Sequence, residues 1–364
     1  MALGPRDLST LALKTGWDAT ELVKFTLQDG TTAAEVFSQL FAATGALSAE
    51  LQSGLWASLA SFTDQPEVSY RMGVSNGMQK HSEYGRADAQ RAQTEGHMLP
   101  LLSWDRALGW TWDYLRKARM DDVEADIADA IKDVRDRWRV SILTRILQRG
   151  DDSGTNKGLG SSGLSPGFAT TAGSTGVDFV PPGNGGLVFA DTHEHYVGIS
   201  GGVYTNAVFE DAYDELREHG HEPPFDFLIS NSDRTTVEAL TKFTPTASAL
   251  VQLGITQDRA NVGAEYLGVI ENFRIREVFG MPQYYGFGYK TYGPGSNRNP
   301  VKVRLEKGVM RPSVLAMADP RNGNGTHPLQ WMMLFMEFGV GVYDRTAGTA
   351  RYNNNATWAD GTPT

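Results

Sequence analysis

The segment 121–149, DDVEADIADAIKDVRDRWRVSILTRILQR, is the longest uninterrupted helical pattern in this sequence. Its apolar residues recur every third or fourth position and so share one face of the predicted helix: Ile127, Ile131, Val134, Trp138, Ile142 and Ile146. At ~1.5 Å per residue the helix would be roughly 43 Å long, whereas a globular helix averages about 11 residues. A helix of this length beside glycine-rich loops suggests a spine across an extended subunit. An ordinary long core helix explains the segment equally well.

Charged residues mark both ends of this predicted helix. Asp121 and Asp122 lie at the positive end of the helix dipole, and Arg145 and Arg149 lie at the negative end. Gly150 follows and can adopt the left-handed conformation that closes a helix.

Composition limits the classes of function. The chain has 364 residues, 40% of them hydrophobic, and a formal net charge of −10. This charge argues against nucleic-acid binding over the whole surface. The absence of Cys excludes disulfides, thiolate metal sites and cysteine nucleophiles. No secretory signal or membrane-spanning apolar run is visible, so we expect a soluble chain that is made in the cytoplasm.

The N-terminal region and the segment after it differ in pattern. Residues 1–65 contain short amphipathic stretches, and helices are predicted over 18–25 and 32–44, the second capped by Thr31 or Thr32. Such short helices need another surface to be stable. The segment 66–103 has two extended arms around a polar, glycine-punctuated tip, which predicts a long hairpin-like excursion.

Two further segments flank the central helix. The stretch 104–118 is rich in aromatic residues that are expected to anchor the base of the excursion to the central helix: Trp104, Trp110, Trp112 and Tyr114. The stretch 150–186 is rich in Gly, Ser and Thr and is predicted to be a second long loop.

The second half of the chain alternates helix and strand patterns. A short strand is predicted at 187–190, a helix over 205–219 that ends at Gly220, and a buried strand over 225–230. Ser232 or Asp233 can cap a further helix that continues to Phe243. Strand patterns dominate from Tyr266 onward, and the C-terminal stretch 351–364 is polar. This order predicts an α+β fold.

Two His-x-His pairs are the strongest candidates for chemistry. His193 and His195 follow a predicted strand and would share one face, where they could bind a metal ion. His219 and His221 repeat the spacing at the end of a helix. A metal site needs three or four ligands, so hydrogen-bonded structural histidines are favoured unless a third ligand lies nearby in space.

Other charged groups have simpler explanations. The carboxylate pairs Asp121–Asp122 and Asp151–Asp152 fit a helix N-terminus and a solvated loop. Lys80, Arg86 and Arg91 give the hairpin tip a mixed charge, which fits solvation or ionic contact with another subunit. The glycine-rich stretch GISGGVYTN (198–206) lacks a phosphate-loop Lys, and the common catalytic motifs are absent. We therefore predict no catalytic, cofactor-binding or metal-binding residues.

These parts, in this order, resemble the major capsid proteins of tailed bacteriophages, which have the HK97-type fold. TNAVFEDAYDELREHGHEP (205–223) followed by FDFLISNSDRTTVEALTKF (225–243) resembles the second peripheral helix leading into the first axial strand and helix. AEYLGVIENFRIREVFGMP (264–282) resembles the glycine-containing strand and proline turn of the family. FGVGVYDRTAG (338–348) resembles the strand that returns to the peripheral domain. No single motif is diagnostic, and the specificity lies in the order.

The resemblance implies a division of the chain into five parts. They are an N-terminal arm (1–65), an extended loop (66–103), a peripheral domain (104–221) with the spine helix 121–149, an axial domain (222–326) and a C-terminal return to the peripheral domain (327–364). A long polar hairpin and a detached arm have no use in a monomer, but in a shell each can lie on a neighbouring copy.

The resemblance also implies a function. The chain would assemble into hexamers and pentamers of an icosahedral head that encloses double-stranded DNA, as part of the virion, after assembly in the host cytoplasm. The implied partners are copies of itself, a scaffolding protein, a portal, a decoration protein, and packaged DNA by non-specific proximity. No membrane, enzymatic activity or cofactor is implied.

One family feature and two alternative functions stay open. Some relatives cross-link Lys in the extended loop to Asn in a neighbour, roles for which Lys80 and Asn353–Asn355 would be the candidates, although nothing local marks them. An encapsulin-like compartment shell shares the fold and would enclose a cargo enzyme. A metal-dependent enzyme that uses His193 and His195 is the third hypothesis, and a third ligand in space would favour it.

Overall fold

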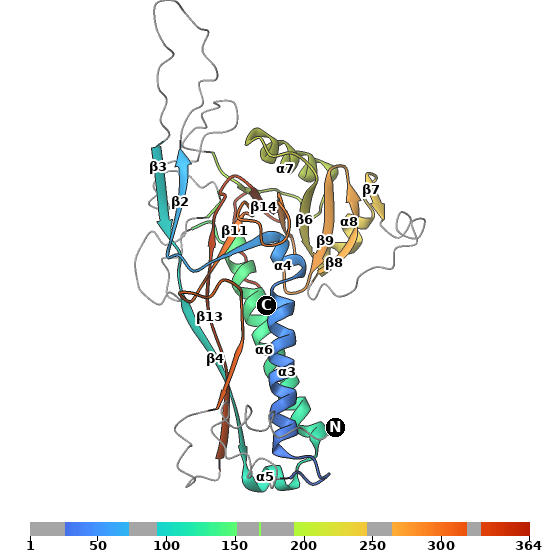
Figure 1. Ribbon diagram of the computed structural model, residues 1–364. Coiled ribbons are helices and arrows are strands. Elements are labelled where there is room, and N and C mark those ends of the chain that lie inside the picture. Colours follow the sequence, from blue (N-terminus) through green and yellow to red (C-terminus); the bar gives the residue numbers. More distant parts are fainter. Residues whose placement is uncertain (1–25, 73–92, 151–166, 169–192, 246–263, 319–328) are drawn as a thin grey trace, which may run out of the picture. The chain divides into compact units, whose positions relative to one another are not determined.

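The structure is a computed structural model that describes residues 26–72, 93–150, 167–168, 193–245, 264–318 and 329–364 (Figure 1). The chain forms two compact units, each built from separate stretches. The first unit contains Met1–Gln52, Ser103–Trp138 and Pro312–Phe338. The second unit contains Ser53–Leu102, Arg139–Arg311 and Gly339–Thr364.

The predicted central helix is confirmed as α6, which spans Met120–Leu147 and continues from one unit into the other. Trp138, Ile142 and Ile146 on the predicted face are fully buried, and Ile127 and Val134 are at least nine-tenths buried. Only Ile131 on that face is partly exposed. The side chain of Asp122 accepts a hydrogen bond from the backbone N–H of Arg119, as expected at a helix N-terminus.

The predicted closing role of Gly150 is wrong. Gly150 does not adopt a positive φ, and α6 ends earlier, at Leu147. Instead the buried guanidinium of Arg145 donates hydrogen bonds to the carbonyl oxygens of Gln148 and Gly150, at 2.8 and 2.6 Å. A cation in the last turn thus satisfies carbonyl groups beyond the helix end, so no left-handed residue is needed.

In the first unit α3 (Ala33–Leu51) lies beside α6. Thr32 and Glu35 form a capping box at its start, so the predicted Thr32 cap is confirmed, but the helix is longer than the predicted 32–44. Arg135 of α6 forms a bidentate ion pair with Glu50 of α3, at 2.6 and 2.8 Å. The predicted helix at 18–25 lies outside the described residues.

Strands β4 (Leu102–Thr111), β12 (Leu315–Ala318) and β13 (Leu329–Val342) also contribute to the first unit, with α5 (Trp112–Lys117) after β4. The predicted aromatic anchors are confirmed at two positions. Arg137 of α6 lies 4.1 Å from the ring of Trp104, and Trp110 donates a hydrogen bond to Asp126 of α6 at 2.8 Å. Tyr114 is 40% exposed, and the structure does not describe the side chain of Trp112.

The second unit begins with α4 (Gly54–Leu59) and β1 (Ala60–Thr63), which pairs in parallel with β11 (Val301–Leu305). The two predicted arms of the excursion are confirmed as β2 (Glu67–Met72) and β3 (Gln93–Met98), which pair antiparallel with Met72 opposite Gln93. The tip between them lies outside the described residues, as does most of the predicted loop 150–186 and the strand at 187–190.

A seven-stranded mixed sheet forms most of the second unit, in the order β5-β14-β10-β6-β9-β8-β7. The strands are β5 (Tyr196–Gly198), β6 (Phe225–Ser230), β7 (Phe243–Pro245), β8 (Ala264–Ile270), β9 (Phe273–Val278), β10 (Tyr285–Tyr289) and β14 (Gly348–Tyr352). Helix α7 (Asn206–Glu218) covers one face of this sheet and ends before Gly220, as predicted. Gly220 has a φ of +79°, the left-handed conformation that is common after the end of a helix.

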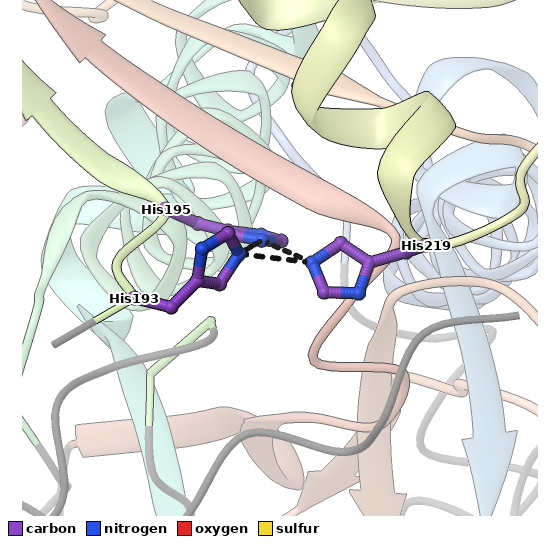
Figure 2. A group of neighbouring side chains, drawn as sticks. All are labelled: His193, His195 and His219. Carbon is purple, nitrogen blue, oxygen red and sulfur yellow. Dashed lines mark hydrogen bonds between the residues drawn. The ribbon is translucent and has the colours of Figure 1, made fainter. Parts of the chain in front are cut away.

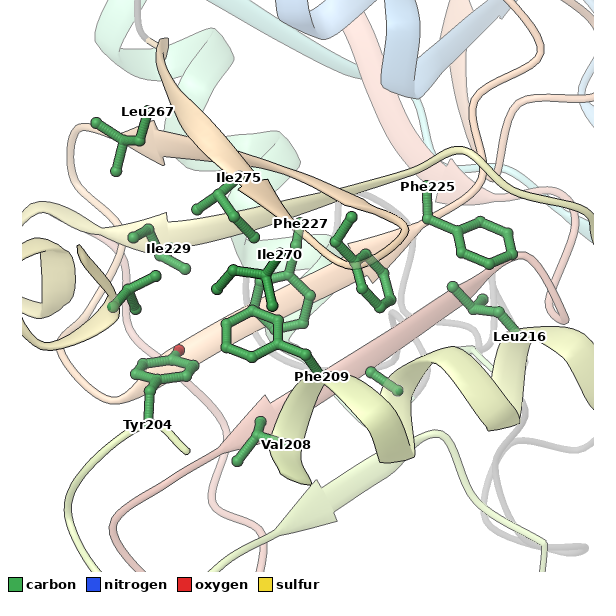
Figure 3. Close-up of a cluster of buried hydrophobic side chains, with 13 residues drawn as sticks. Tyr204, Val208, Phe209, Leu216, Phe225, Phe227, Ile229, Leu267, Ile270 and Ile275 are labelled. Carbon is green, nitrogen blue, oxygen red and sulfur yellow. The ribbon is translucent and has the colours of Figure 1, made fainter. Parts of the chain in front are cut away.

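The core between α7 and the sheet consists mainly of aromatic and branched side chains (Figure 3). Phe225, Phe227 and Ile229 alternate along β6 and point toward the helix, where they meet Phe209 and Leu216. The rings of Phe209 and Phe227 have centroids 4.8 Å apart. This packing fixes α7, and therefore the residue that follows it, against the sheet.

The predicted helix from Ser232 or Asp233 to Phe243 is wrong in length. A 3₁₀ turn, η1 (Asn231–Asp233), leads into α8, which spans only Arg234–Glu238. Phe243 instead begins β7 and pairs with Ile270 of β8. Strand pairing with a distant segment therefore overrides the local helical pattern.

Gly268 of β8 shows why this pairing needs a glycine. A Cβ atom at this position would lie 2.4 Å from the carbonyl oxygen of Thr244 and 2.7 Å from the ring of Phe243. The ring and the backbone of β7 thus occupy the space that any other side chain would need.

The polar C-terminal stretch is integrated into the sheet. Arg351 and Asn353 are fully buried, and Arg351 binds Glu215 and Asp211 of α7. The ring of Trp358 packs edge-on against Tyr196 of β5, with centroids 5.0 Å apart. Helices and strands are interspersed along the chain, so the α+β class is confirmed. Among the described residues, no helix combines the length and the apolar character needed to cross a bilayer.

Candidate functional site

Three histidines from two segments of the second unit converge in space (Figure 2). His193 and His195 immediately precede β5, at the edge of the seven-stranded sheet. His219 is the C-cap residue of α7. Because α7 packs on the sheet, its C-terminal end brings His219 to the His-x-His pair. The third candidate ligand that the sequence analysis required is therefore present.

The three side chains approach one another through the same ring atom. The Nε2 atom of His193 lies 3.2 Å from that of His195 and 3.2 Å from that of His219. The Nε2 atoms of His195 and His219 are 2.7 Å apart. His195 is fully buried, His219 is 7% exposed and His193 is partly buried.

The rings diverge from this common point. Their centroids are 4.7 to 5.2 Å apart, about 2 Å more than the Nε2 atoms in each pair, and the ring planes are inclined by 60 to 76°. Rings that only stacked would keep centroids and nitrogens at similar separations. The arrangement is that of imidazoles directed at one centre.

Neighbouring groups determine the protonation and the tautomer of these imidazole rings. The Nδ1 atom of His195 lies 2.7 Å from the carbonyl oxygen of Gly348, which can only accept, so Nδ1 carries the proton and donates it. Burial lowers the pKa of His195 well below its usual value. Burial also lowers the pKa of His219 to about 2. Both rings are therefore neutral near pH 7, and the Nε2 atom of His195 presents a lone pair.

A carboxylate lies beside the three histidines. Thr349 and Arg351 both donate hydrogen bonds to Oε2 of Glu215, whereas its Oε1 lies 3.8 Å from Nε2 of His195. This position of Glu215 beside the histidines was not predicted from the sequence. The spacing of Glu215 and His219 is a usable signal, because residues four apart share a face of a helix.

His221, the last member of the two His-x-His pairs, does not join this group. Its Nδ1 lies 2.8 Å from the hydroxyl of Tyr292, and its Nε2 lies 3.0 Å from the hydroxyl of Thr346. Both ring nitrogens therefore have ordinary hydrogen-bond partners. His221 is the hydrogen-bonded structural histidine that the sequence analysis favoured for all of these positions.

The other predicted candidates do not form a site among the described residues. Asp121 and Asp122 lie in the first turn of α6, as the simpler explanation held. Asn353 is fully buried, whereas Asn354 and Asn355 are exposed. The remaining candidates lie outside the described residues: Lys80, Arg86, Arg91, Asp151 and Asp152. The cross-link therefore stays a prediction.

Exposed apolar side chains mark candidate contact surfaces. Large hydrophobic residues at least 40% exposed occur in both units: Met98, Tyr114, Val203, Phe279, Met310 and Leu315. Phe279 and Met310 are each 64% exposed. Isolated exposed residues of this kind are normal on a monomer, but they are also available to neighbouring copies.

Comparison with solved structures gives matches along most of the chain. A chain from Mycobacterium phage Patience aligns over 93% of both chains, with 20% sequence identity and a TM-score of 0.61. The mature capsid of bacteriophage PhiM1 aligns over 84% of this chain and 88% of its own, with 11% identity and a TM-score of 0.50. The acid-stable capsid of Helicobacter pylori bacteriophage KHP30 aligns over 83% and 91%, with 9% identity and a TM-score of 0.51.

The chain has the fold of a phage capsid subunit. The HK97-type fold expected from the sequence is thereby confirmed. No protein-family model matches the sequence, and neither does any curated protein. The likeness of fold to these three structures is thus present at sequence identities of 9 to 20%.

Proposed function

We propose that this chain is a major capsid protein, which self-assembles into the hexamers and pentamers of an icosahedral phage head around double-stranded DNA. The observation that carries the proposal is the extent of the structural match. The alignment with the chain from Mycobacterium phage Patience covers 93% of both chains, so the likeness extends over almost the whole of each. The two named capsids match over more than four-fifths of each chain.

In this proposal the five parts of the sequence have separate roles in the shell. Residues 1–65 form an arm and 66–103 an extended loop, both of which lie on neighbouring copies. Residues 104–221 form the peripheral domain around the spine helix, 222–326 form the axial domain, and 327–364 return to the peripheral domain. The paired strands β2 and β3 support an excursion of the required kind.

Assembly into a shell would explain the long polar hairpin and the N-terminal arm, which a monomer does not require. Stable interfaces bury about 1,600 Å² each, and a subunit that forms several of them contributes to a durable particle. Heterologous contacts repeated around closed symmetry axes generate such particles. The net charge of −10 limits tight adhesion of packaged DNA to the wall, while individual Lys and Arg residues still reach phosphates.

The proposal includes the partners of a phage head. A scaffolding protein would guide assembly in the host cytoplasm, a portal would occupy one vertex, and a decoration protein could bind the finished shell. The protein would act as a structural component of the virion and not as an enzyme. Its contact with DNA would be non-specific.

Electron microscopy of the expressed chain tests the proposal. Co-expression with the scaffolding protein should give closed icosahedral shells. Persistent monomers in the presence of scaffold would contradict the proposal. Shells that contain a co-purifying enzyme instead of scaffold or DNA would favour an encapsulin-like compartment.

A further inference from the structure

We propose that His193, His195 and His219 bind a divalent transition-metal ion of the zinc class, which ties the C-terminal end of α7 to the edge of the seven-stranded sheet. The three side chains come from two segments that are separated by the whole of α7. The site is structural and does not depend on the proposed capsid function.

Hydrogen bonds among the three rings cannot satisfy all three Nε2 atoms at the same time. A neutral imidazole has one donor and one acceptor nitrogen, and the Nε2 atom of His195 is an acceptor because its Nδ1 donates to Gly348. Any placement of protons on the other two Nε2 atoms leaves two lone pairs or two N–H groups facing each other. A bound cation removes this conflict by accepting a lone pair from all three nitrogens.

The distances fit a zinc ion. The three Nε2 atoms form a triangle with sides of 3.2, 3.2 and 2.7 Å. An ion about 1 Å out of the plane of this triangle would lie about 2.0 Å from each nitrogen, which is the usual Zn–N distance. Tetrahedral coordination would place ligand nitrogens about 3.3 Å apart, so only the edge between His195 and His219 must widen.

The neighbouring groups have the features of a metal site. The hydrogen bond from His195 Nδ1 to the Gly348 carbonyl fixes the tautomer and orientation of a ligand ring, as partners of metal-bound histidines commonly do. Glu215 supplies a compensating negative charge, and Thr349 and Arg351 hold its Oε2 so that Oε1 faces His195. Glu215 Oε1 or a water molecule would complete the coordination.

The choice of ligands indicates the class of metal. Imidazole nitrogens suit Zn²⁺, Cu²⁺, Ni²⁺ and Co²⁺, whereas Mg²⁺ and Ca²⁺ require mainly oxygen ligands. Binding would be linked to folding, because the three ligands converge only when α7 is packed on the sheet. A bound ion therefore stabilises the second unit by mass action.

The test is metal binding by the full-length chain after removal of any affinity tag. The protein is stripped with a chelator, loaded with Zn²⁺ and dialysed, and its metal content is measured. We expect about one Zn²⁺ per chain and an increase in melting temperature on loading. Co²⁺ should bind in its place and give the intense visible absorption of a tetrahedral nitrogen site. Substoichiometric zinc with an unchanged melting temperature would overturn the proposal.

Three glutamine variants show whether Zn²⁺ binds at this site or at histidines elsewhere in the chain. His193→Gln and His219→Gln should each weaken Zn²⁺ binding more than about tenfold. Removal of a hydrogen-bond partner of a metal ligand already weakens metal binding by about tenfold or more, and removal of the ligand itself should weaken it further. His221→Gln is the control, because this buried histidine lies two residues away but binds hydroxyl groups. Equal Zn²⁺ affinity in all three variants would contradict the assignment. His193 is the least buried of the three ligands, so His193→Gln is the variant that best preserves folding.

Discussion

Arg145 shows how the role of one residue depends on its surroundings. Its position near the end of α6 suggests a solvated charge that interacts with the helix dipole, yet it is 2% exposed and bonds two carbonyl groups. Arg351 is similar, because a charged residue in a polar tail is fully buried against Glu215. Such roles follow from partners in space and not from local sequence.

Replacement of Arg145 tests its capping role. Arg145→Met should lower the free energy of unfolding by about 2–4 kcal/mol, because two partly buried carbonyl groups lose charge-assisted hydrogen bonds from a buried guanidinium. Arg116→Met is the control, since this exposed arginine lies in the last turn of α5 and should change stability by less than about 0.5 kcal/mol. Urea denaturation measures both. Equal effects would contradict the assigned role.

Two glycines give opposite predictions for substitution by alanine. Gly268→Ala should destabilise the protein by about 1–3 kcal/mol, because the added methyl group would collide with Thr244 and Phe243. Gly45 lies inside α3, and a Cβ there would have no atom within 4 Å. Gly45→Ala should therefore stabilise the protein by about 0.5–1 kcal/mol. Thermal denaturation of both variants measures these changes in stability. A change of the same sign in both variants would be inconsistent with the structure.

Asp233 gives a prediction for pH dependence. Burial raises its pKa from 3.8 to about 6, although the carboxylate accepts a hydrogen bond from the backbone N–H of Tyr284. Between about pH 4 and 6 the folded state binds more protons at this site than the unfolded state, so stability falls as pH rises through this range. Asp233→Asn keeps the acceptor oxygen but removes the charge.

The Asp233→Asn variant should therefore be more stable than the wild type at pH 7, by about 2–3 kcal/mol. The difference should shrink toward zero below about pH 4, where the wild-type carboxyl is protonated in both states. Urea titrations of both proteins at pH 4 and pH 7 measure it. A difference that does not change with pH would refute the assigned pKa.

At the scale of elements, helix caps differ in how much they contribute. Thr32 accepts a hydrogen bond from the backbone N–H of Glu35 through its side chain, and the Glu35 carboxylate accepts one from the backbone N–H of Thr32. Thr205 occupies the same position before α7 but makes no capping hydrogen bond through its side chain. Thr32→Ala should cost about 1 kcal/mol of stability and Thr205→Ala only a few tenths, as measured by chemical denaturation. A larger loss at Thr205 would contradict this ranking.

The elements that sequence predicts well are those with a strong period and clear ends. Helices α6 and α7 and strand β6 have apolar patterns and flanking turn residues, so the sequence predicts each of them near its observed position. The prediction of α8 was too long because Phe243 pairs with Ile270, a contact that local sequence does not encode. The end of α6 was misplaced for a similar reason, since Arg145 supplies the cap.

The histidine cluster shows the same limit at a site. His193 and His195 were recognisable from their spacing, but His219 lies beyond them by the length of a loop and a helix. Only the packing of α7 on the sheet brings it within 2.7 Å of His195. Sequence spacing can thus predict the two neighbouring ligands of a site, while the third ligand is identified only from the tertiary structure.

At the scale of the whole molecule, the hairpin offers a direct test of shell contacts. Met72 of β2 lies opposite Gln93 of β3, so a two-residue Asn-Gly turn can replace residues 73–92 and keep the strand register. The shortened chain should retain the melting temperature of the wild-type monomer but fail to form shells. Analytical ultracentrifugation with scaffold present measures this. Normal assembly of the shortened chain would show that the loop is dispensable.

In the proposed shell, copies of this chain cover one another around closed symmetry axes. Electron cryomicroscopy of particles formed by the chain with its scaffolding protein would show these contacts. We expect icosahedral particles whose wall is built of hexamers and pentamers of this subunit, with residues 66–103 lying on a neighbouring copy. Particles without such order, or a subunit whose arm and hairpin fold back onto its own body, would contradict it.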